Sequence, residues 1–142
     1  MLGSAYDNED CSAAATLAIV GERWSLLILR DAMFRGLTRF SQFQKSLGLA
    51  TNVLGARLEK FVEHGLMERL QPQGQVPEYR LTRKGLELKP VLLALTEWGD
   101  RWLAPGPVVY IDRADGRPVG LRLARDGDEA RIDIAEVTVR RR

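Results

Sequence analysis

The segment Leu49–Leu70 contains the amphipathic pattern that most constrains how this chain can fold. At about 100° per residue, its apolar residues fall on one helix face and its polar residues on the other. The apolar face carries Leu54, Leu58, Phe61 and Val62, and the opposite face carries Asn52, Ala56, Glu59, Lys60 and Glu63. The pattern predicts a helix with Thr51 as its N-cap and with His64 and Gly65 at its end.

The exposed surface at the start of this helix is made of small or amide-bearing residues. They are Thr51, Asn52, Gly55 and Ala56. Such a surface lets a helix approach a partner closely, and the first turns of a helix are the part that reads a DNA major groove. An ordinary helix packed on a core has the same apolar face, so this segment alone leaves both interpretations open.

Composition places the chain among globular proteins. It has 142 residues, of which 45% are hydrophobic and 28% charged, so we expect one domain with an appendage rather than a disordered chain. No apolar run reaches the length of a membrane span, and the acidic N-terminus lacks the charged start and apolar core of a signal peptide. These features predict a cytoplasmic protein with no membrane partner. The single cysteine excludes an internal disulfide and a cysteine-based zinc site, and we expect neither metal nor cofactor.

Charge is unevenly distributed along the chain. From Ala32 to Leu58 there is no Asp or Glu, although the chain has 19 acidic residues in all. The same segment holds Arg35, Arg39, Lys45 and Arg57. The net charge is only +2, so this local distribution says more about partners than the total does. A positive surface of this kind attracts phosphates, and it includes the first half of the amphipathic helix.

Two helices are predicted near the N-terminus. The first follows a cap at Asp10 or Ser12 and runs to Val20, where Gly21 ends it. The second, Trp24–Phe34, is apolar nearly all round, which is typical of a helix at the centre of a domain.

A third short helix is predicted between Thr38, its cap, and Gly48, which closes it. Its inward residues are Phe40, Phe43 and Leu47, and its outward residues are Arg39, Gln42 and Lys45. A tight turn containing Gly separates it from the amphipathic helix. Two helices joined in this way match the helix-turn-helix pattern.

A hairpin and a long helix are predicted next. The strand patterns Leu66–Leu70 and Glu78–Thr82 are separated by the Pro- and Gly-bearing spacer 71–77, which is typical of a hairpin loop. Thr82 then caps a long helix, in which Pro90 either bends the helix or marks its true first turn.

The segment after Pro105 differs in pattern from the rest. It alternates apolar and polar residues, and Asp115-Gly116 and Asp126-Gly127 are hairpin-turn dipeptides, so we expect three or four short antiparallel strands. A piece this small has no core of its own and must pack on the first domain or on a partner chain. We therefore predict a domain of residues 1–104 and an extension of residues 105–142. The fold class is α+β, mainly α: a winged helix-turn-helix domain with a long C-terminal dimerisation helix and a small antiparallel β extension.

Several short motifs occur in one order along residues 9–103. They are Cys11 with the Ala-rich helix after it, Gly21-Glu22-Arg23-Trp24, Leu27-Ile28-Leu29-Arg30, Arg39-Phe40, Leu54-x-x-Arg57-Leu58, His64-Gly65-Leu66, Glu78-Tyr79-Arg80-Leu81-Thr82, Lys84-Gly85 and Trp98-Gly99-x-x-Trp102. Together they resemble the HxlR-type family of bacterial transcription regulators, relatives of the MarR group. The resemblance implies a homodimer that binds a short inverted repeat in double-stranded DNA. It also implies that residues 51–57 lie in the major groove, that the hairpin lies near the minor groove, and that the first and last helices form the dimer.

Candidate DNA contacts come from the third helix, the fourth helix and the hairpin loop. They are Arg39, Ser41, Gln42, Lys45, Thr51, Asn52, Val53, Ala56, Arg57, Gln73 and Gln75. Asn52 can pair with the edge of adenine, and the basic residues of the third helix can contact phosphates; each can equally be a solvated side chain. Arg57 either contacts DNA or forms an internal ion pair with Glu22 or Asp31.

The remaining candidates concern dimerisation and regulation. The predicted dimer interface consists of Leu17, Leu95, Trp98 and Trp102, because the last helix carries too much apolar surface for a lone exposed helix. A small-molecule inducer is a further expectation, with Trp24 and Phe34 lining a cleft; core packing is the alternative. The resemblance assigns Cys11 a role in sensing oxidants or electrophiles, and plain packing is the alternative.

We expect a regulator, most simply a repressor, rather than an enzyme. The sequence shows no nucleophile with a base, no metal cluster and no Gly-rich phosphate loop. A regulator released from DNA by a small aromatic or electrophilic compound, and a winged helix used only for protein contacts, remain as alternatives.

Overall fold

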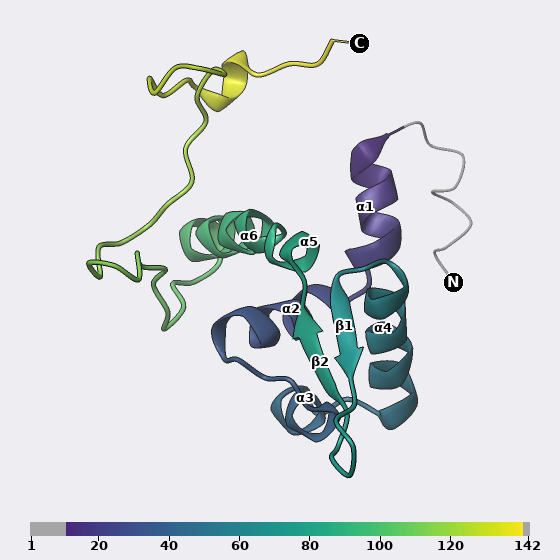
Figure 1. Cartoon of the computed structure of the whole chain (residues 1–142). Coiled ribbons are helices and arrows are strands. Elements are labelled where there is room, and N and C mark those ends of the chain that lie inside the picture. The colour runs from purple at the N-terminus through teal and green to yellow at the C-terminus, as the bar shows by residue number, and fades with distance from the viewer. Residues whose placement is uncertain (1–10, 141–142) are drawn as a thin grey trace. The chain divides into compact units, whose positions relative to one another are not determined.

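A computed structural model of the protein describes residues 11–140, which fall into two compact units. One unit ends at Leu92 and the other begins at Leu93. In chain order the described elements are α1 (Ser12–Val20), α2 (Ser25–Phe34), α3 (Phe40–Leu47), α4 (Thr51–Glu63), β1 (Met67–Leu70), β2 (Glu78–Leu81), α5 (Arg83–Leu86), α6 (Lys89–Trp102) and the 3-10 helix η1 (Ile134–Glu136) (Figure 1). The division between the units lies inside α6, whereas the pattern of the sequence placed a domain boundary after residue 104.

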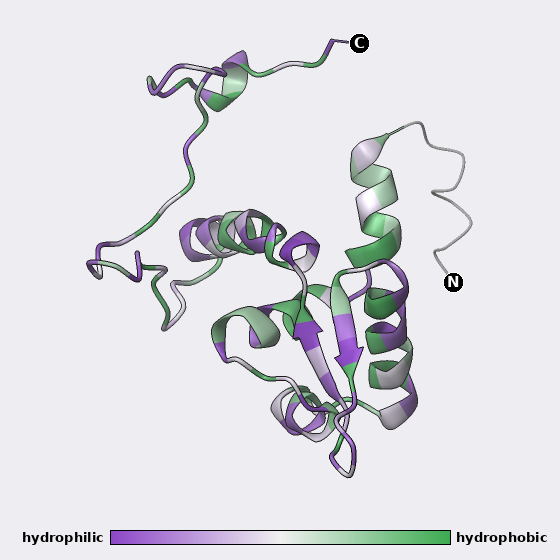
Figure 2. Cartoon of the chain, viewed as in Figure 1, coloured by the Kyte–Doolittle hydropathy of each residue, from purple (hydrophilic) through white to green (hydrophobic). Residues whose placement is uncertain are grey.

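The predicted apolar face of α4 is the centre of the first unit. Leu54, Leu58 and Phe61 are completely buried, as the periodicity requires, and the green side of α4 in Figure 2 turns toward the rest of the unit. They join residues of every neighbouring element in one hydrophobic cluster. Its buried members are Val20, Ile28, Leu29, Phe43, Leu49, Leu54, Leu58, Phe61, Leu66 and Met67. Burial of this face fixes which side of α4 remains at the surface.

Glycines in the left-handed conformation end both helices of the helix-turn-helix. Gly48 closes α3 with a φ of 65°, and Gly65 follows α4 with a φ of 72°. Both conformations favour glycine, because a Cβ atom would strain the backbone there. The predicted cap at Thr51 is wrong: Ala50 is the N-cap, and Thr51 is the first helical residue.

The turn between α3 and α4 is held by Gln44 instead. Its Nε2 donates to the carbonyl oxygen of Leu49 at 3.2 Å and to Oγ1 of Thr51 at 3.0 Å. At the other end of α3 the N-cap is Arg39, one residue after the predicted Thr38. Oε1 of Gln42 accepts from the backbone N–H groups of Thr38 and Arg39, at 3.0 and 2.9 Å, so a side chain satisfies both donors.

The hairpin forms as predicted, with strands one residue shorter than the sequence pattern. β1 and β2 pair antiparallel, with Met67 opposite Leu81 and Leu70 opposite Glu78. β2 also reaches α3: the N–H of Tyr79 donates to the carbonyl oxygen of Thr38 at 2.7 Å. The hairpin is therefore attached to the start of α3 as well as to the end of α4.

Thr82 caps α5 as predicted, and its Oγ1 accepts from the N–H of Gly85 at 3.1 Å. The expected long helix is two helices, because the chain leaves helical geometry at residues 87–88. Pro90 is the second residue of α6, so it marks the first turn rather than a bend.

α1 and α2 complete the first unit. α1 starts directly after Cys11 and ends at Gly21, within a residue of the expected bounds. Its last turn is anchored to α4, since Nζ of Lys60 donates to the carbonyl oxygen of Ala18 at 2.6 Å. No single helix in residues 11–140 is long and apolar enough to cross a membrane; α1 and α2 meet that test only as a pair, bent by 79°.

α2 contains a buried charge that its apolar pattern concealed. The Asp31 side chain is fully buried, and its Oδ1 accepts from Nε of Arg30 at 2.9 Å. Its Oδ2 accepts from Oγ of Ser46 on α3 at 2.5 Å. A buried carboxylate is stable only when its oxygens are paired in this way, so this contact fixes α3 against α2.

The second unit consists of the greater part of α6 and the extension. The expected strands appear only as single bridges, Ile111 with Pro118 and Ala124 with Arg131. The predicted hairpin turns are present, and Gly116 and Gly127 have φ values of 73° and 76°. The extension alternates in sequence, but its strands find no continuous partner within the described chain.

Three polar contacts attach the extension to α6. Oγ1 of Thr96 lies 2.8 Å from the hydroxyl of Tyr110. Oε1 of Glu97 accepts from the N–H of Leu121, and Oδ1 of Asp100 accepts from the N–H of Gly106, both at 2.8 Å.

We expect opposite stability changes from alanine at two helical glycines. A Cβ at Gly55 would lie 4.0 Å from Phe40, an ordinary contact, so Gly55→Ala should raise the free energy of unfolding by about 0.4–1 kcal/mol. A Cβ at Gly85 would lie 2.2 Å from the carbonyl oxygen of Leu66, so Gly85→Ala should lower it by about 1–3 kcal/mol. Urea unfolding at one protein concentration measures both. A lower midpoint for Gly55→Ala would show that α3 and α4 pack more tightly than described.

Candidate nucleic-acid interface

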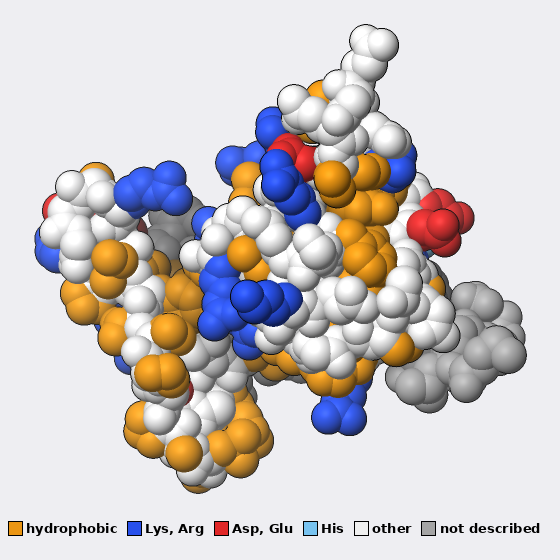
Figure 3. Space-filling model, turned by 90° about the horizontal axis from the view of Figure 1, so that it is seen from below, with side chains coloured by type: hydrophobic (Ala, Val, Ile, Leu, Met, Phe, Trp, Pro, Cys, Tyr) orange, Lys and Arg blue, Asp and Glu red, His pale blue; other side chains and the backbone are white. Residues whose placement is uncertain are grey.

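Three segments of the first unit meet at one end of it. Figure 1 shows α3, the N-terminal end of α4 and the hairpin loop together at the bottom of the view. Figure 3 views this end from below, and Lys and Arg side chains lie in the middle of the face and along the hairpin. The acid-free segment of the sequence supplies α3 and the first half of α4. The face therefore has the geometry and charge of a candidate nucleic-acid interface.

The first turns of α4 form the centre of this face. Thr51, Asn52 and Ala56 are exposed, as the sequence pattern requires for contact with a partner. Val53 is half-buried and packs against the core, so its side chain is turned largely inward. Gly55, expected on the exposed face, is half-buried and lies toward Phe40 of α3.

α3 contributes a row of exposed polar side chains beside α4. Ser41, Gln42 and Lys45 are all exposed. The amide of Gln42 has a defined orientation, because its oxygen is used by the cap and its nitrogen is left to face outward. Within the described chain Lys45 takes part in no ion pair, so no carboxylate occupies its ammonium group.

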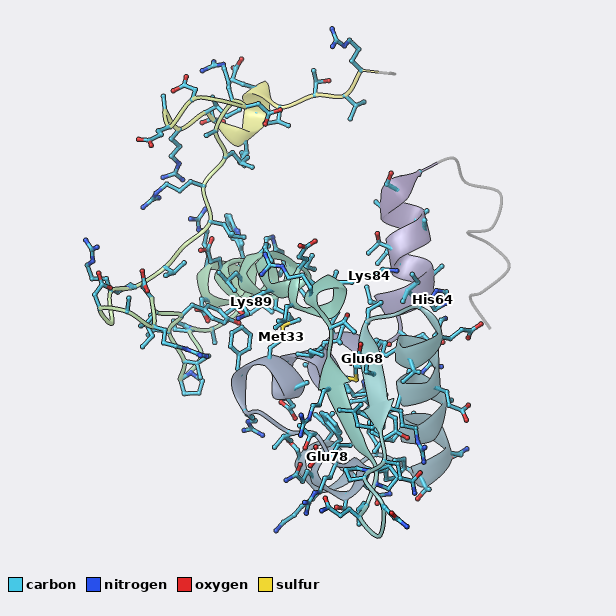
Figure 4. All side chains as sticks on the ribbon, in the orientation of Figure 1. Met33, His64, Glu68, Glu78, Lys84 and Lys89 are labelled. Carbon is cyan, nitrogen blue, oxygen red and sulfur yellow. The ribbon has the colours of Figure 1, made fainter. Side chains whose placement is uncertain are left out.

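Glu78 forms ion pairs with two arginines at the base of the hairpin. Its Oε2 lies 2.7 Å from Nη2 of Arg80, and its Oε1 lies 3.9 Å from Nε of Arg39. Figure 4 labels Glu78 beside α3, where the hairpin strand starts. Two guanidinium groups share one carboxylate there, so the hairpin base keeps a positive charge next to Ser41 and the start of α3.

The hairpin strands hold basic residues that the sequence analysis missed. The expected contacts Gln73 and Gln75 are exposed in an uncharged loop, whereas Arg69 and Arg80 are exposed on the adjoining strands. Arg69 pairs across the hairpin with Tyr79 in the backbone register. Period-two alternation identifies Arg80, which lies between the half-buried Tyr79 and Leu81, but not Arg69, which shares its face of the hairpin with the buried Met67.

Arg57 does not lie free on the face. Its Nη2 is 2.7 Å from Oε2 of Glu22, and only 15% of its side chain is exposed. Nε and Nη1 of Arg57 are buried and have no hydrogen-bond partner among the described residues. This position favours the internal ion pair over the DNA contact, because a neutralised and largely buried guanidinium is a poor phosphate ligand.

The expected interface residues are exposed in their own units. Leu17 on α1 is exposed in the first unit. On α6, Leu95, Trp98 and Trp102 are 54%, 60% and 67% exposed. Spacings of three and four residues put them on one stripe, so the second unit offers a continuous apolar and aromatic surface.

The candidates for regulation are separated from one another. Cys11 is exposed at the N-cap of α1. Trp24 and Phe34 lie at the two ends of α2, roughly 15 Å apart along a helix of this length, so one small molecule does not contact both within one chain. Arg23 lies 4.9 Å from the centre of the Trp24 ring, and Lys89, labelled in Figure 4, lies 5.4 Å from that of Phe34. In the described part of the chain no group of three His, Cys, Asp or Glu side chains could hold a metal ion.

Comparisons with known proteins agree with this arrangement. The model of the HxlR-like helix-turn-helix family matches residues 19–107. The HTH-type transcriptional regulator Rv3095 of Mycobacterium tuberculosis is 40% identical over 122 residues, which are 84% of this chain and 71% of that protein. The crystal structure of PA1607, a candidate transcription factor, has a TM-score of 0.84 and 41% identity, and the match covers 98% of this chain and 100% of that one. That match extends through the C-terminal extension.

A more distant structure concerns regulation. The redox regulator HypR in its reduced form has a TM-score of 0.56 and 26% identity, covering 66% of this chain and 96% of that chain. The similarity to HypR therefore covers only about two thirds of this chain.

One conclusion about the protein follows from the matched family model, from the sequence identity to Rv3095 and from the winged arrangement of α3, α4 and the hairpin. It is a transcriptional regulator with a DNA-binding domain and not an enzyme, and it belongs to the HxlR-like helix-turn-helix family, whose fold resembles that of the MarR group.

Proposed function

We propose that this regulator represses transcription by binding an inverted-repeat operator as a homodimer, with α4 in the major groove. The observation that carries the proposal is the exposure of Thr51, Asn52 and Ala56, which belong to the acid-free segment 32–58, at the end of the first unit where α3 and the hairpin also lie. Small and amide side chains there allow close approach to base edges, and the flanking basic residues suit the phosphates on either side. Because the operator would lie on the bacterial chromosome, this function implies that the protein acts in the cytoplasm.

The homodimer is supported by the apolar stripe of α6. Leu95, Trp98 and Trp102 leave a larger apolar surface exposed than an isolated helix normally keeps. A two-fold axis through such a stripe would bury it against its own copy. A dimer also supplies two copies of α4, which an inverted repeat requires.

We expect specific and salt-sensitive binding to a palindrome with half-sites roughly 34 Å apart. Selection from random duplexes, followed by fluorescence anisotropy at several salt concentrations, measures this. Asn52→Ala should cost about 1–3 kcal/mol and relax preference at one base position. Arg39→Ala should weaken binding to all sequences alike, since a phosphate contact carries no sequence information.

Arg83→Ala is the matched control, because Arg83 is an exposed arginine on α5 that pairs with Glu87 at 3.1 Å. Its affinity should equal that of the wild type. If selection enriches no palindrome, the protein is not an operator-binding regulator, and the alternative of a winged helix used only for protein contacts takes its place.

The α6 stripe should control the oligomeric state. Trp102→Glu should give monomers or insoluble protein, because a carboxylate at the interface loses its hydration without gaining a partner. Trp102→Phe keeps the apolar surface and should stay dimeric. Light scattering after size-exclusion chromatography distinguishes the two results. A Trp102→Glu protein that remains a dimer and binds DNA normally would refute this interface.

A redox response is a second candidate function, favoured by the exposure of Cys11 and by the similarity to a redox regulator. An exposed thiol is accessible to oxidants and electrophiles, as a sensor requires. Cys11 is the chain's only cysteine, so oxidation would join it to the other subunit or to a small thiol.

Diamide treatment should lower operator affinity of the wild type and leave Cys11→Ser unchanged. Equal loss in both proteins, or loss in neither, would exclude Cys11 as a sensor. A small aromatic inducer is a further alternative; screening aromatic acids, quinones and aldehydes for release of the operator tests it without assuming a site.

A further inference from the structure

The C-terminal extension is an addition to the domain that defines the family. The matching family model ends at residue 107, whereas the match to PA1607 includes the extension. Membership of the family therefore says nothing about what this segment does. Its role has to be inferred from its own contacts, exposure and charge.

The first part of the extension is attached to α6. It turns back at Gly116, and the N–H of Val119 donates to the carbonyl oxygen of Tyr110 at 2.8 Å. Hydrogen bonds join it to α6 at Gly106, Tyr110 and Leu121. Within the described residues, Leu121 is the last residue of the extension that forms a hydrogen bond with α6, so the segment after it has no such attachment.

Residues 122–140 form an arm with almost no packing of its own. Its backbone meets at one bridge, Ala124 with Arg131, beside which the N–H of Ile132 donates to the carbonyl oxygen of Leu123 at 2.9 Å. Every residue of the arm except Ile132 is exposed, and apolar and polar residues alternate along it (Figure 2). The large apolar residues that it exposes are Leu123, Ile134, Val137 and Val139. Since contact with water disfavours such a surface, a partner that covers these side chains stabilises the arm.

The backbone of the arm is also open to a partner. A full antiparallel ladder would pair the residues on both sides of the turn at Gly127, but the described arm contains only the single bridge. Extended backbone with unpaired N–H and C=O groups pairs readily with another strand. The arm therefore offers both hydrogen bonds and apolar side chains to the same partner.

The charges of the arm favour a second copy of this chain as that partner. Its basic residues are Arg122, Arg125, Arg131 and Arg140, and its acidic residues are Asp126, Asp128, Glu129, Asp133 and Glu136. Nucleic acids and anionic membranes attract segments with an excess of positive charge, and the arm has none. A second arm carries the same mixture of both signs, so two arms meet without net repulsion.

The position of the extension on α6 also favours a second copy. The α6 residues that bond the extension are Thr96, Glu97 and Asp100. At about 100° per residue, they lie on the opposite side of the helix from the apolar stripe, so the extension leaves the stripe uncovered. A second copy can therefore use both surfaces. Even folded back as a hairpin, a segment as long as the arm reaches roughly 30 Å, or about three helix diameters, which is enough to extend past a pair of helices.

We propose that the arms of the two subunits pair with each other in the dimer, joining their backbones as strands and burying their apolar side chains. The inference rests on the proposed function, since it takes the homodimer as given. A two-fold axis brings the same surface of both subunits together, as the mixed charges of the arm allow. The arm adds to the contact made by the α6 stripe and tightens the dimer, because two linked contacts bind more strongly than either alone.

The first test is the strength of the dimer, measured by sedimentation equilibrium of the full chain over a series of concentrations. Val137→Asp and Val139→Asp should each raise the dissociation constant of the dimer about tenfold or more. Each puts a carboxylate where both subunits bury an apolar side chain. Thr138→Asp is the matched control: it adds the same charge on the other side of the extended chain and should change the constant by less than about twofold.

The same variants separate pairing between copies from packing within one chain. Val137 and Val139 are exposed in the single chain, so their replacement should leave the thermal midpoint of the monomer at the wild-type value. A lower midpoint at every protein concentration, with an unchanged dimer constant, would show that the arm packs on its own chain. That result would overturn the proposal.

The second test locates the contact. A photo-crosslinking benzophenone amino acid in place of Val139, in a mixture of two differently tagged full-length chains, should give a product that contains both tags. Mass spectrometry should find the crosslinked site of the partner within residues 122–140. A crosslink within one chain, a site elsewhere on the partner or no crosslinked product would each contradict the pairing of the arms.

The third test concerns DNA, which the arm does not contact under this proposal. Above the concentration at which Val139→Asp dimerises, its operator affinity should show the wild-type dependence on salt. A shallower dependence would show that the arm contacts phosphates and would overturn the assignment. If the wild type is a monomer, the proposed homodimer itself fails. If Trp102→Glu disrupts the dimer but Val137→Asp and Val139→Asp behave as Thr138→Asp does, only this inference fails.

Discussion

Burial of one face of α4 is the constraint on which the rest of the first unit depends. Leu54, Leu58 and Phe61 are fully buried, and residues from α1, α2, α3 and β1 pack around them. Because a helix has a period of 3.6 residues, fixing this face also fixes the exposure of Asn52 and Ala56 on the other. The packing of the core thus determines which surface of α4 is exposed as the proposed reading face. A rotation of α4 about its own axis would disrupt both the core packing and this surface.

Buried or half-buried carboxylates organise the arginines around this face. Glu78 holds Arg39 and Arg80 at the base of the hairpin, and Asp31 holds Arg35 through Ser46. In each case one acid orients more than one guanidinium group, so the region remains positive while its side chains lose freedom. Ordered donors cost less conformational entropy when a phosphate binds, which is the advantage of orienting them in the free protein.

The second unit has a different physical character. Most of its large apolar residues are exposed, including Trp98, Trp102 and Val109, and its strands pair only through single bridges. The extension is held to α6 by side-chain hydrogen bonds rather than by a hydrophobic core. An apolar surface of this kind is consistent with the proposed dimer, in which a second copy would supply the missing neighbours.

The sequence by itself determined the elements whose signals are local: the apolar period of α4, the spacer of the hairpin and the cap at Thr82. It could not determine which partner a charged residue would take, so Arg57 could equally be predicted to contact DNA or to form an internal ion pair. In the folded chain, Nη2 of Arg57 lies 2.7 Å from Oε2 of Glu22. The sequence pattern also predicted that Gly55 is exposed, whereas Gly55 is half-buried beside Phe40, and it missed the hydrogen bond between Asp31 and Ser46. These outcomes depend on how residues distant in sequence meet. Periodicity records only which face of a helix is apolar, whereas tertiary packing decides what lies against it.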